Sequence, residues 1–337
     1  MNFVDQFLHD HYDEFALDRY GLGKRWETLL LTPRFATSRH VVALIFPARH
    51  TEPALVVKVP RQPGDNTGVR REAAMLAQLS AVVDSPDAGV PRLVGVRDMG
   101  AYTVLVETAL TGTPLDPRTV AADLSSAVAT GTEFVGALPC TRPAADNVDW
   151  YQRTVRDPLA ALEALSGQDA QTCELVERTH AVLAPLQRAQ LPAVIEHGDL
   201  SHPNLLVKPG APLQVMDWER SLTGGVPGHD LVFYLQYLSE SSEQAFVREA
   251  QLAAFDKAFG RGGWAHGPLS LHLGMRGVDE SLFPLLVIAT WARSTATLAD
   301  RLAQEAAPGL SQGNGKVRAT LMADRDFWLW RHALDAA

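Results

Sequence analysis

The stretch that decides the fold runs H-G-D-L-S-H-P-N-L-L-V-K-P-G-A-P-L-Q-V-M-D, residues 197–217. Its Pro- and Gly-rich middle predicts a turn, and the apolar runs on either side predict the two arms of a β-hairpin. If Val207 pairs with Gln214, then Asn204 faces Asp217, and directly opposed Cβ atoms lie about 4.5–5.5 Å apart. The hairpin then brings an amide and a carboxylate together at its open end, with Asp199 just upstream.

Three oxygen-bearing side chains at one end of a hairpin suit a hard cation such as Mg²⁺. This ion takes few protein ligands and completes its coordination with phosphate and water. Asp and Asn also favour turns for their own conformational reasons. An ordered trio around one hairpin nevertheless favours a site for metal and phosphate.

The first hundred residues predict a small antiparallel sheet. Strands rich in β-branched residues are expected at residues 27–31, 40–46, 54–59, 92–96 and 102–107. Between the third and fourth of these, residues 69–79 combine strong helix formers with apolar positions at helical spacing. The order strand-strand-strand-helix-strand-strand indicates a compact β-rich lobe.

After residue 111 the sequence changes to helical patterns. Helices are expected at residues 117–138, 174–190, 242–259 and 316–334. The apolar run at residues 282–292 is too short for a bilayer span and favours a buried helix. A small β-rich lobe joined to a larger helical one would leave a cleft, which is a preferred place for a ligand.

In combination, these residues resemble a known enzyme family. His197-Gly198-Asp199, then Asn204, then Asp217 closing the hairpin resemble the catalytic core of the aminoglycoside phosphotransferase and choline kinase family, relatives of the protein kinases. The resemblance covers about residues 24–235. It implies an α+β, bilobal protein kinase-like fold. The N-terminal lobe, residues 1–109, would hold a small antiparallel β-sheet with one main helix, and the C-terminal lobe, residues 110–337, would be larger and mostly helical.

The resemblance also implies roles for the hairpin residues. Asp199 would be the catalytic residue, accepting the proton of a substrate hydroxyl and orienting its oxygen toward the γ-phosphate of ATP. Asn204 and Asp217 would hold Mg²⁺ against the phosphate oxygens. A carboxylate near its ordinary pKa is ionised at pH 7, so Asp199 needs no large shift of its pKa to act.

In the β-rich lobe, the resemblance implies a site for the ATP cofactor. Lys58 in V-V-K-V and Glu72 in R-R-E-A-A resemble the family's phosphate-binding lysine and its partner glutamate. Residues 105–110 stand where such a kinase has its hinge, so the backbone of Glu107 and Ala109 would bind the adenine. As a single residue, Lys58 could equally be a strand lysine that reaches solvent.

Two departures from the protein-kinase pattern stand out. Residues 32–39, in the place of the glycine-rich loop, contain no glycine, although Thr37 and Ser38 could offer backbone N–H groups and hydroxyls to phosphate. Asp217 is followed by Trp218-Glu219, and only a short segment separates it from the next predicted helix. This leaves little room for a long regulated activation loop and favours an enzyme assembled constitutively for a small substrate.

The acceptor is expected to be a hydroxyl of a small molecule such as an aminoglycoside or other amino-sugar, a nucleoside antibiotic or an amino alcohol. The alternative is Ser or Thr of a precursor peptide in natural-product biosynthesis. Residues that set specificity are expected within residues 115–190 and the C-terminal helices.

Two other classes remain as alternatives. His197, Asp199, His202, Asp217 and His229 could be ligands of a metallohydrolase, since imidazole and carboxylate suit zinc or iron, but this leaves Lys58 and Glu72 unexplained. A non-catalytic nucleotide-binding module normally lacks one of the catalytic residues, and here none is missing.

Three neighbouring residues have simpler interpretations. His197 is expected to be a structural, hydrogen-bonding residue of the loop. Asp230 is expected in the first turn of a helix. Glu219 is either a second contact to metal or substrate, or a solvated acid.

Composition limits the partners. The chain has 337 residues, 46% hydrophobic and 20% charged, with a net charge of −9, which excludes disordered and collagen-like classes and a general binder of nucleic acid. Residues 111–337 carry 18 − 26 = −8 of this charge, so a cationic or neutral acceptor is expected there. Two cysteines outside any C-x-x-C pair, and no visible secretory signal or membrane span, favour a cytoplasmic protein. The oligomeric state is left open.

Overall fold

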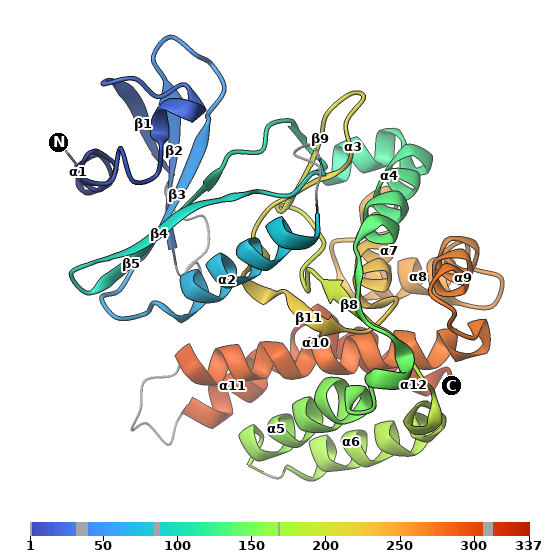
Figure 1. Ribbon diagram of the computed structural model, residues 1–337. Coiled ribbons are helices and arrows are strands. Elements are labelled where there is room, and N and C mark those ends of the chain that lie inside the picture. Colours follow the sequence, from blue (N-terminus) through green and yellow to red (C-terminus); the bar gives the residue numbers. More distant parts are fainter. Residues whose placement is uncertain (1, 32–39, 84–87, 168, 306–312) are drawn as a thin grey trace. The chain divides into compact units, whose positions relative to one another are not determined.

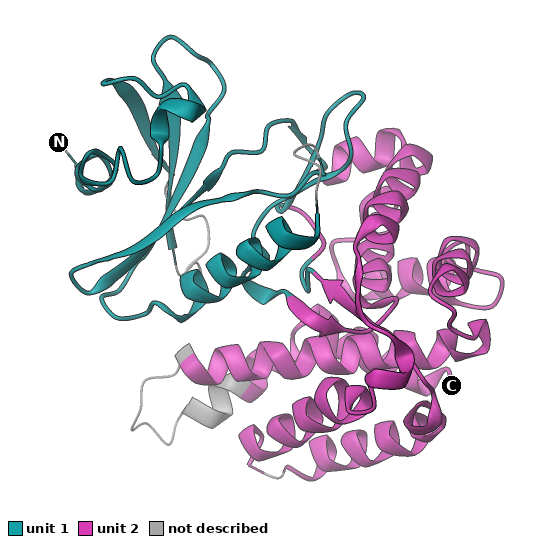
Figure 2. Ribbon diagram, viewed as in Figure 1, with its two compact units in different colours: residues 1–115, 197–199, 203–221 teal, residues 116–196, 200–202, 222–337 magenta. Residues whose placement is uncertain are grey.

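The computed structural model describes residues 2–31, 40–83, 88–167, 169–305 and 313–337 (Figure 1). The chain divides into two compact units (Figure 2). Unit 1 contains Met1–Leu115, His197–Asp199 and Pro203–Ser221, and unit 2 contains Asp116–Glu196, Leu200–His202 and Leu222–Ala337. Most of the 197–217 stretch thus belongs with the first 115 residues, whereas the sequence analysis assigned it to the second lobe. The boundary between residues 109 and 110 stays a prediction.

Unit 1 is built on a five-stranded antiparallel sheet in the order β1-β2-β3-β5-β4. Its strands are β1 Trp26–Leu31, β2 His40–Pro47, β3 Leu55–Pro60, β4 Leu93–Met99 and β5 Tyr102–Thr108. The helix α2, Thr67–Val82, connects β3 to β4. The expected antiparallel sheet with one main helix is therefore confirmed, and the strand bounds differ from expectation by only a few residues.

One face of this sheet is covered by the N-terminal segment, which the sequence analysis did not expect to be helical. It forms α1, Phe3–Asp10, and a short 3-10 helix, Leu17–Tyr20. Asp5 in α1 accepts hydrogen bonds from Trp26 Nε1 at 3.0 Å and Thr28 Oγ1 at 2.6 Å. Apolar side chains of this segment pack in one core with those of β2, β3 and β5, among them Phe7, Leu8, Leu17, Ile45, Val57 and Val106.

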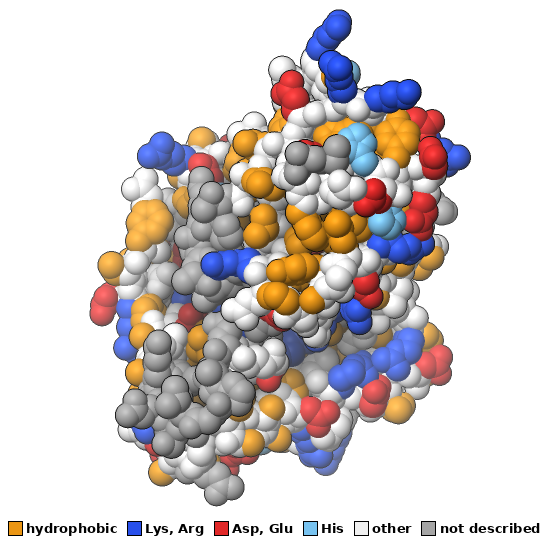
Figure 3. Space-filling view, turned by 90° about the vertical axis from the view of Figure 1, so that its left-hand side faces the viewer, with side chains coloured by type: hydrophobic (Ala, Val, Ile, Leu, Met, Phe, Trp, Pro, Cys, Tyr) orange, Lys and Arg blue, Asp and Glu red, His pale blue; other side chains and the backbone are white. Residues whose placement is uncertain are grey.

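The other face of the sheet carries Lys58. Side chains point alternately to the two faces of a sheet along each strand. The residues two positions from Lys58 on β3, and the residues that pair with Lys58 on the neighbouring strands, therefore lie on the same face as Lys58. At its β1 edge lie Leu29 and Leu31, which are 52% and 41% exposed, opposite the half-buried Leu44 and Val42 of β2. Figure 3 shows one side of the molecule, on which hydrophobic side chains lie at the surface among charged ones. The lysine face therefore combines a charged group with open apolar surface.

The predicted hairpin is present, with a register different from the expected one. Its arms are β9, Leu205–Val207, and β10, Gln214–Val215, and β6, Thr113–Pro114, pairs with β9 on the other side. Leu206 pairs with Gln214, and Met216 N donates to Asn204 O at 2.9 Å. Asn204 therefore lies opposite Met216 and not opposite Asp217, because the observed pair Leu206–Gln214 encloses seven residues, whereas the expected pair Val207–Gln214 enclosed six. The hairpin does not by itself make Asn204 and Asp217 a cross-strand pair.

Unit 2 is mostly helical and contains a small three-stranded sheet, β11-β8-β7. The strands are β7 Cys140–Arg142, β8 Ala193–Glu196 and β11 Leu222–Gly225. The helices are α3 Pro117–Ala122, α4 Leu124–Ala137, α5 Asp157–Leu165, α6 Ala170–Val182, α7 His229–Ser242, α8 Arg248–Phe259, α9 His266–Met275, α10 Phe283–Glu305, α11 Gly313–Met322 and α12 Arg325–Asp335. With the sheet-rich unit 1, this confirms the expected α+β class.

Polar caps explain where the helices depart from expectation. The helix expected at residues 117–138 is broken into α3 and α4, because Asp123 accepts a hydrogen bond from Ser126 N and begins a new helix. In the same way Asp324 starts α12 within the helix expected at residues 316–334. The helix α10 is long and apolar enough to cross a membrane, but 67% of its apolar window is buried within the fold. It is the buried helix that the apolar run at residues 282–292 predicts.

Candidate active site

Lys58 lies at the centre of a buried ion-pair cluster in unit 1. Strand β3 directs its side chain toward α2, where Glu72 Oε1 accepts from Lys58 Nζ at 2.6 Å. Glu72 Oε1 also accepts from the backbone N–H of Trp218 at 2.9 Å. One carboxylate oxygen therefore links the lysine of β3 to the segment that follows the hairpin.

Glu107 provides a second carboxylate to the same lysine, at 3.2 Å. Glu107 is expected from the sequence to bind nucleotide through its backbone, and the ion pair of its side chain is an additional role. The pairing of β3 with β5 accounts for the contact between Glu107 and Lys58, because Glu107 pairs with Val56 and Leu105 pairs with Lys58. Lys58 and Glu107 are thus diagonal neighbours on one face of an antiparallel pair, within reach of long side chains.

Asp217 lies at the solvent-facing side of this cluster. Its Oδ1 is 3.9 Å from Lys58 Nζ, and its side chain is 43% exposed. Although burial lowers the pKa of the Lys58 ammonium, the carboxylates of Glu107, Glu72 and Asp217 together raise it well above the ordinary value. Lys58 is therefore a permanent cation in this site.

The backbone of Asp217 is left-handed, with φ of 66°. This conformation ends the regular alternation of β10 and turns the chain into the short 3-10 helix Trp218–Arg220. Asp and Asn adopt it at lower cost than other residues with a side chain. It brings Asp217 to Lys58 even though the hairpin register does not place it opposite Asn204.

The loop before the hairpin is fixed by its own hydrogen bonds. His197 Nε2 donates to Met216 O at 2.8 Å, and the Asp199 N–H donates to His197 Nδ1 at 3.2 Å. Gly198 has φ of 81°, and a Cβ there would lie 2.8 Å from the carbonyl oxygen of Arg220. His197 is thus the structural residue that was expected.

Asp199 is paired with Arg220 at 3.3 Å, and both side chains are about one-third exposed or less, at 27% and 30%. No role for Arg220 was expected from the sequence. Its guanidinium orients the Asp199 carboxylate, which is partly open to solvent.

Asn204 and Asp217 have the chemistry that Mg²⁺ requires. Asn204 Nδ2 donates to Asp199 O at 3.1 Å, which leaves the amide oxygen as the free end of the side chain. Among the described residues, no group of three or more His, Cys, Asp or Glu side chains is arranged to hold a metal. Two oxygen ligands, with water and phosphate completing the shell, suit magnesium, whereas a zinc site needs more protein ligands.

The metallohydrolase alternative finds no support in the histidines. Both ring nitrogens of His197 are engaged by the backbone, so neither is available to a metal. Neither His202 nor His229 belongs to a group of three or more possible metal ligands among the described residues. Lys58 and Glu72, which this alternative left unexplained, form a close ion pair.

Glu219 is not a freely solvated acid. Its side chain is 27% exposed and lies 3.6 Å from His40 Nδ1 on β2. Burial, together with the charge of Asp217, raises the pKa of Glu219 to about 7. The contact connects the segment after Asp217 to β2.

Ala109 and residues 32–39 are the remaining segments that were expected to contact the nucleotide. The N–H of Ala109 donates to Ala54 O at 2.9 Å, so an adenine contact from Ala109 would come from its carbonyl oxygen. Residues 32–39, with the phosphate contacts expected of Thr37 and Ser38, lie outside the described residues.

In unit 2, the residue that precedes the motif is strongly anchored. Glu196 ends β8, is 1% exposed and accepts from Arg293 of α10 at 2.6 Å. The N–H of Val226 donates to its other carboxylate oxygen. Asp230 lies in the first turn of α7, as expected. No local pattern indicates the Glu196–Arg293 pair, because 97 residues separate its members.

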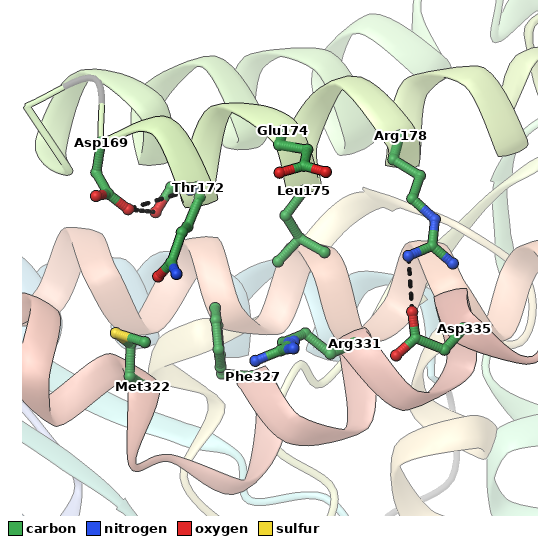
Figure 4. Close-up of a pocket in the computed structure, with 10 residues that line it drawn as sticks. Asp169, Thr172, Glu174, Leu175, Arg178, Met322, Phe327, Arg331 and Asp335 are labelled. Atoms are coloured by element: carbon green, nitrogen blue, oxygen red, sulfur yellow. Dashed lines mark hydrogen bonds and ion pairs between the residues drawn. The ribbon is translucent and has the colours of Figure 1, made fainter.

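Unit 2 also contains a groove of about 220 Å³ between α6 and α12 (Figure 4). Its walls carry mutually paired charges, since Arg178 binds Asp335 at 2.7 Å and Asp169 binds Arg318 at 2.9 Å. Asp169 also caps α6 through Thr172. These interactions hold α6 against the C-terminal helices and provide no group suited to phosphoryl transfer.

The fold and the Lys58, Glu72 and Asp217 cluster define a protein kinase-like phosphotransferase. The model of the family described as "Phosphotransferase enzyme family" matches residues 43–266. The match spans more than half of the chain, and the chain belongs to this family. The expected enzyme class, a phosphotransferase with an alcohol group as acceptor, is thereby confirmed.

Solved structures show the same fold at low sequence identity. A thermostable mutant of aminoglycoside phosphotransferase APH(4)-Ia, in a ternary complex with ADP and hygromycin B, is 12% identical with a TM-score of 0.51, covering 93% of this chain and 98% of its own. An ethanolamine kinase of Plasmodium vivax is 10% identical with a TM-score of 0.51, covering 90% and 82%. No curated protein matches the chain.

The ion-pair cluster predicts a large effect of Lys58→Met on stability. Without the ammonium, Glu72 and Glu107 would be buried carboxylates with no cation, a defect that costs about 3–5 kcal/mol. Both acids would then hold protons more tightly in the folded than in the unfolded chain, so the loss grows as pH rises. Urea denaturation at pH 6 and pH 8 measures it. Lys24→Met, at an exposed lysine, is the matched control, and equal stability of both variants would show that Lys58 does not neutralise the cluster.

Proposed function

We propose that the chain is an ATP- and Mg²⁺-dependent O-phosphotransferase that transfers the γ-phosphate of ATP to a hydroxyl of a small molecule. The observation that carries this proposal is the convergence in unit 1 of Lys58, Glu72 and Asp217, since both carboxylates lie within 4.0 Å of the lysine ammonium, at 2.6 Å and 3.9 Å. Asn204 and Asp199 lie in the adjoining loop, joined by a hydrogen bond. Phosphoryl transfer requires this combination of positioning and charge neutralisation.

Asp199 is assigned the role of base. Its carboxylate would accept the proton of the acceptor hydroxyl as the hydroxyl oxygen bonds to the γ-phosphorus and the bond to the β-phosphate oxygen breaks, releasing ADP. Arg220, at 3.3 Å, would orient Asp199 before the acceptor arrives. Such a base contributes about 10²–10⁴-fold to the rate.

Lys58 is assigned to the α- and β-phosphates, in the orientation that Glu72 fixes. Asp217 and the amide oxygen of Asn204 are assigned to Mg²⁺. When bound, Mg²⁺ would neutralise charge on the phosphate oxygens. The open apolar surface of Leu29, Leu31 and their neighbours on the lysine face suits the flat face of a nucleobase.

For the acceptor we propose an amino-sugar such as an aminoglycoside, a nucleoside antibiotic or an amino alcohol. The charge of −8 on residues 111–337 favours cationic molecules of these classes. The solved relatives with the same fold include a complex with hygromycin B and an ethanolamine kinase. Free Cys140 and Cys173 and the use of ATP fit a cytoplasmic enzyme.

An ATP-consumption screen tests this proposal. Purified chain with Mg²⁺ and ATP would be offered amino-sugars, nucleosides, amino alcohols and Ser/Thr peptides, and ADP release would be measured. We expect turnover with a member of the first three groups, and none when Mg²⁺ is chelated. Consumption with peptides only would favour the precursor-peptide alternative, and activity with zinc in the absence of ATP would favour a hydrolase.

A further inference from the structure

Glu107 is a second buried carboxyl group beside Lys58, whose single positive charge already faces Glu72. The Glu107 side chain is almost wholly buried, and its Oε1 lies 3.2 Å from Lys58 Nζ. Its Oε2 is buried and has no hydrogen-bond partner among the described residues. A single ammonium thus serves two buried carboxylates, Glu72 and Glu107, and a third, more exposed one at Asp217.

The two buried carboxylates are held in different ways. Glu72 Oε1 accepts from the Trp218 N–H as well as from Lys58, so it keeps a partner if the lysine moves. Glu107 has Lys58 as the only cation within ion-pair distance among the described residues. Of the two contacts, the one to Glu107 is also longer, at 3.2 Å against 2.6 Å. Lys58 can therefore leave Glu107 more easily than Glu72.

Nucleotide phosphates would approach Lys58 as a further anionic partner. The attraction between Lys58 and a phosphate depends on how much of the ammonium charge other anions already neutralise. If Nζ moves toward a phosphate, Glu107 remains as a buried carboxylate without a cation, which is unfavourable. Phosphate binding and the Lys58–Glu107 contact are therefore alternatives.

We propose that Glu107 competes with nucleotide phosphates for the ammonium of Lys58 and thereby lowers the affinity of the site for nucleotide. This inference rests on the proposed ATP-binding function and deepens it. Glu107 acts through Lys58 and is a positioning residue. Its effect requires the charged form of its carboxyl group.

The charge of Glu107 depends on pH in the range that an assay can cover. Burial raises the pKa of Glu107 to about 8, against the lowering effect of Lys58 on β3. Glu72 on α2 and Asp217 after β10 raise it further through their negative charges. Most Glu107 carboxyl groups are then neutral at pH 7 and ionised at pH 9. Competition is weak at pH 7 and strong at pH 9.

The substitution Glu107→Gln tests this, because it keeps the size of the side chain and removes its charge. The dissociation constant of Mg²⁺-ATP would be measured by calorimetry for the full chain at pH 7 and pH 9. We expect E107Q to bind about three- to tenfold more tightly than the wild type at pH 9 and nearly equally at pH 7, since one proton changes affinity by at most tenfold per pH unit. Glu52→Gln removes a charge at an exposed position and should behave as wild type.

Equal or weaker binding by E107Q at pH 9 overturns the inference. In a Lys58→Met background the same substitution should have no effect, and an undiminished effect there also overturns it, because Glu107 would then not act through Lys58. If E107Q does not fold, Glu107→Leu, which also removes the charge, takes its place in the same comparison at pH 7 and pH 9. If neither the wild type nor any variant binds nucleotide, the proposed function is refuted as well. If nucleotide binding depends on Lys58 but is unchanged by the substitution of Glu107, only this inference is refuted.

Discussion

Asp199→Asn is expected to lower turnover by about 10²–10⁴-fold while leaving the binding of Mg²⁺-ATP nearly unchanged. The amide has the shape of the carboxylate and can still accept a hydrogen bond from Arg220, which lies 3.3 Å away. It cannot accept the proton of the acceptor hydroxyl. Lys58, Glu72 and Asp217 do not contact Asp199, so the groups assigned to the phosphates and the metal stay in place.

Steady-state ADP release with the acceptor found in the screen measures this effect. Thermal denaturation with and without Mg²⁺-ATP shows whether the nucleotide still binds, because a ligand of the folded state raises the melting temperature. Arg220→Gln is a matched variant, since it removes the partner of Asp199 and should cost less than the loss of the base. Turnover within about threefold of wild type in Asp199→Asn would exclude Asp199 as the base.

Asp217→Asn is expected to abolish both turnover and the stabilisation by Mg²⁺-ATP. Asn adopts the left-handed backbone of position 217 readily, so the substitution changes the charge without straining the chain. The nucleotide-free protein should not lose stability. The negative charge of Asp217 raises the pKa of both Glu72 and Glu219, and its removal relieves that repulsion.

Together the two variants separate chemistry from metal binding. Asp199→Asn should keep the melting-temperature shift caused by Mg²⁺-ATP, and Asp217→Asn should lose it at every Mg²⁺ concentration that saturates the wild type. Asp217→Ala provides a comparison, because it also removes the carboxylate but adds backbone strain that should lower the stability of the free protein. A normal shift in Asp217→Asn would mean that the metal is held without this residue.

The sequence allowed much of this site to be predicted because its residues lie in short local patterns. Lys58 and Glu72 are positioned by a β-rich run and a helical run, and Asp199 and Asp217 flank a hairpin with a clear turn. The hairpin register was wrong by one residue, because a Pro-Gly turn does not fix how many residues it contains. No local sequence pattern indicates the left-handed backbone of Asp217 or the hydrogen bond from the Trp218 N–H to Glu72.

Interactions between distant parts of the chain were not predictable from pattern alone. The side chain of Glu107 reaches Lys58 through the β3–β5 register, and Arg293 reaches Glu196 across 97 residues. In both cases tertiary contacts determine the structure. The N-terminal helix α1 is different, because its capping Asn2 and the helical spacing of Val4, Phe7 and Leu8 are local signals that were overlooked.

The composition of unit 1 has a consequence for synthesis of the protein. Its sheet is complete by residue 115, but Glu72 receives its backbone hydrogen bond from Trp218, and Asp217 and Asn204 lie more than eighty residues beyond the sheet. While the chain is being made from its N-terminus, the sheet can form with Lys58 and Glu72 already paired. A nascent chain that ends before residue 218 therefore lacks the backbone partner of Glu72, and the Lys58–Glu72 pair is completed only after the hairpin has been made.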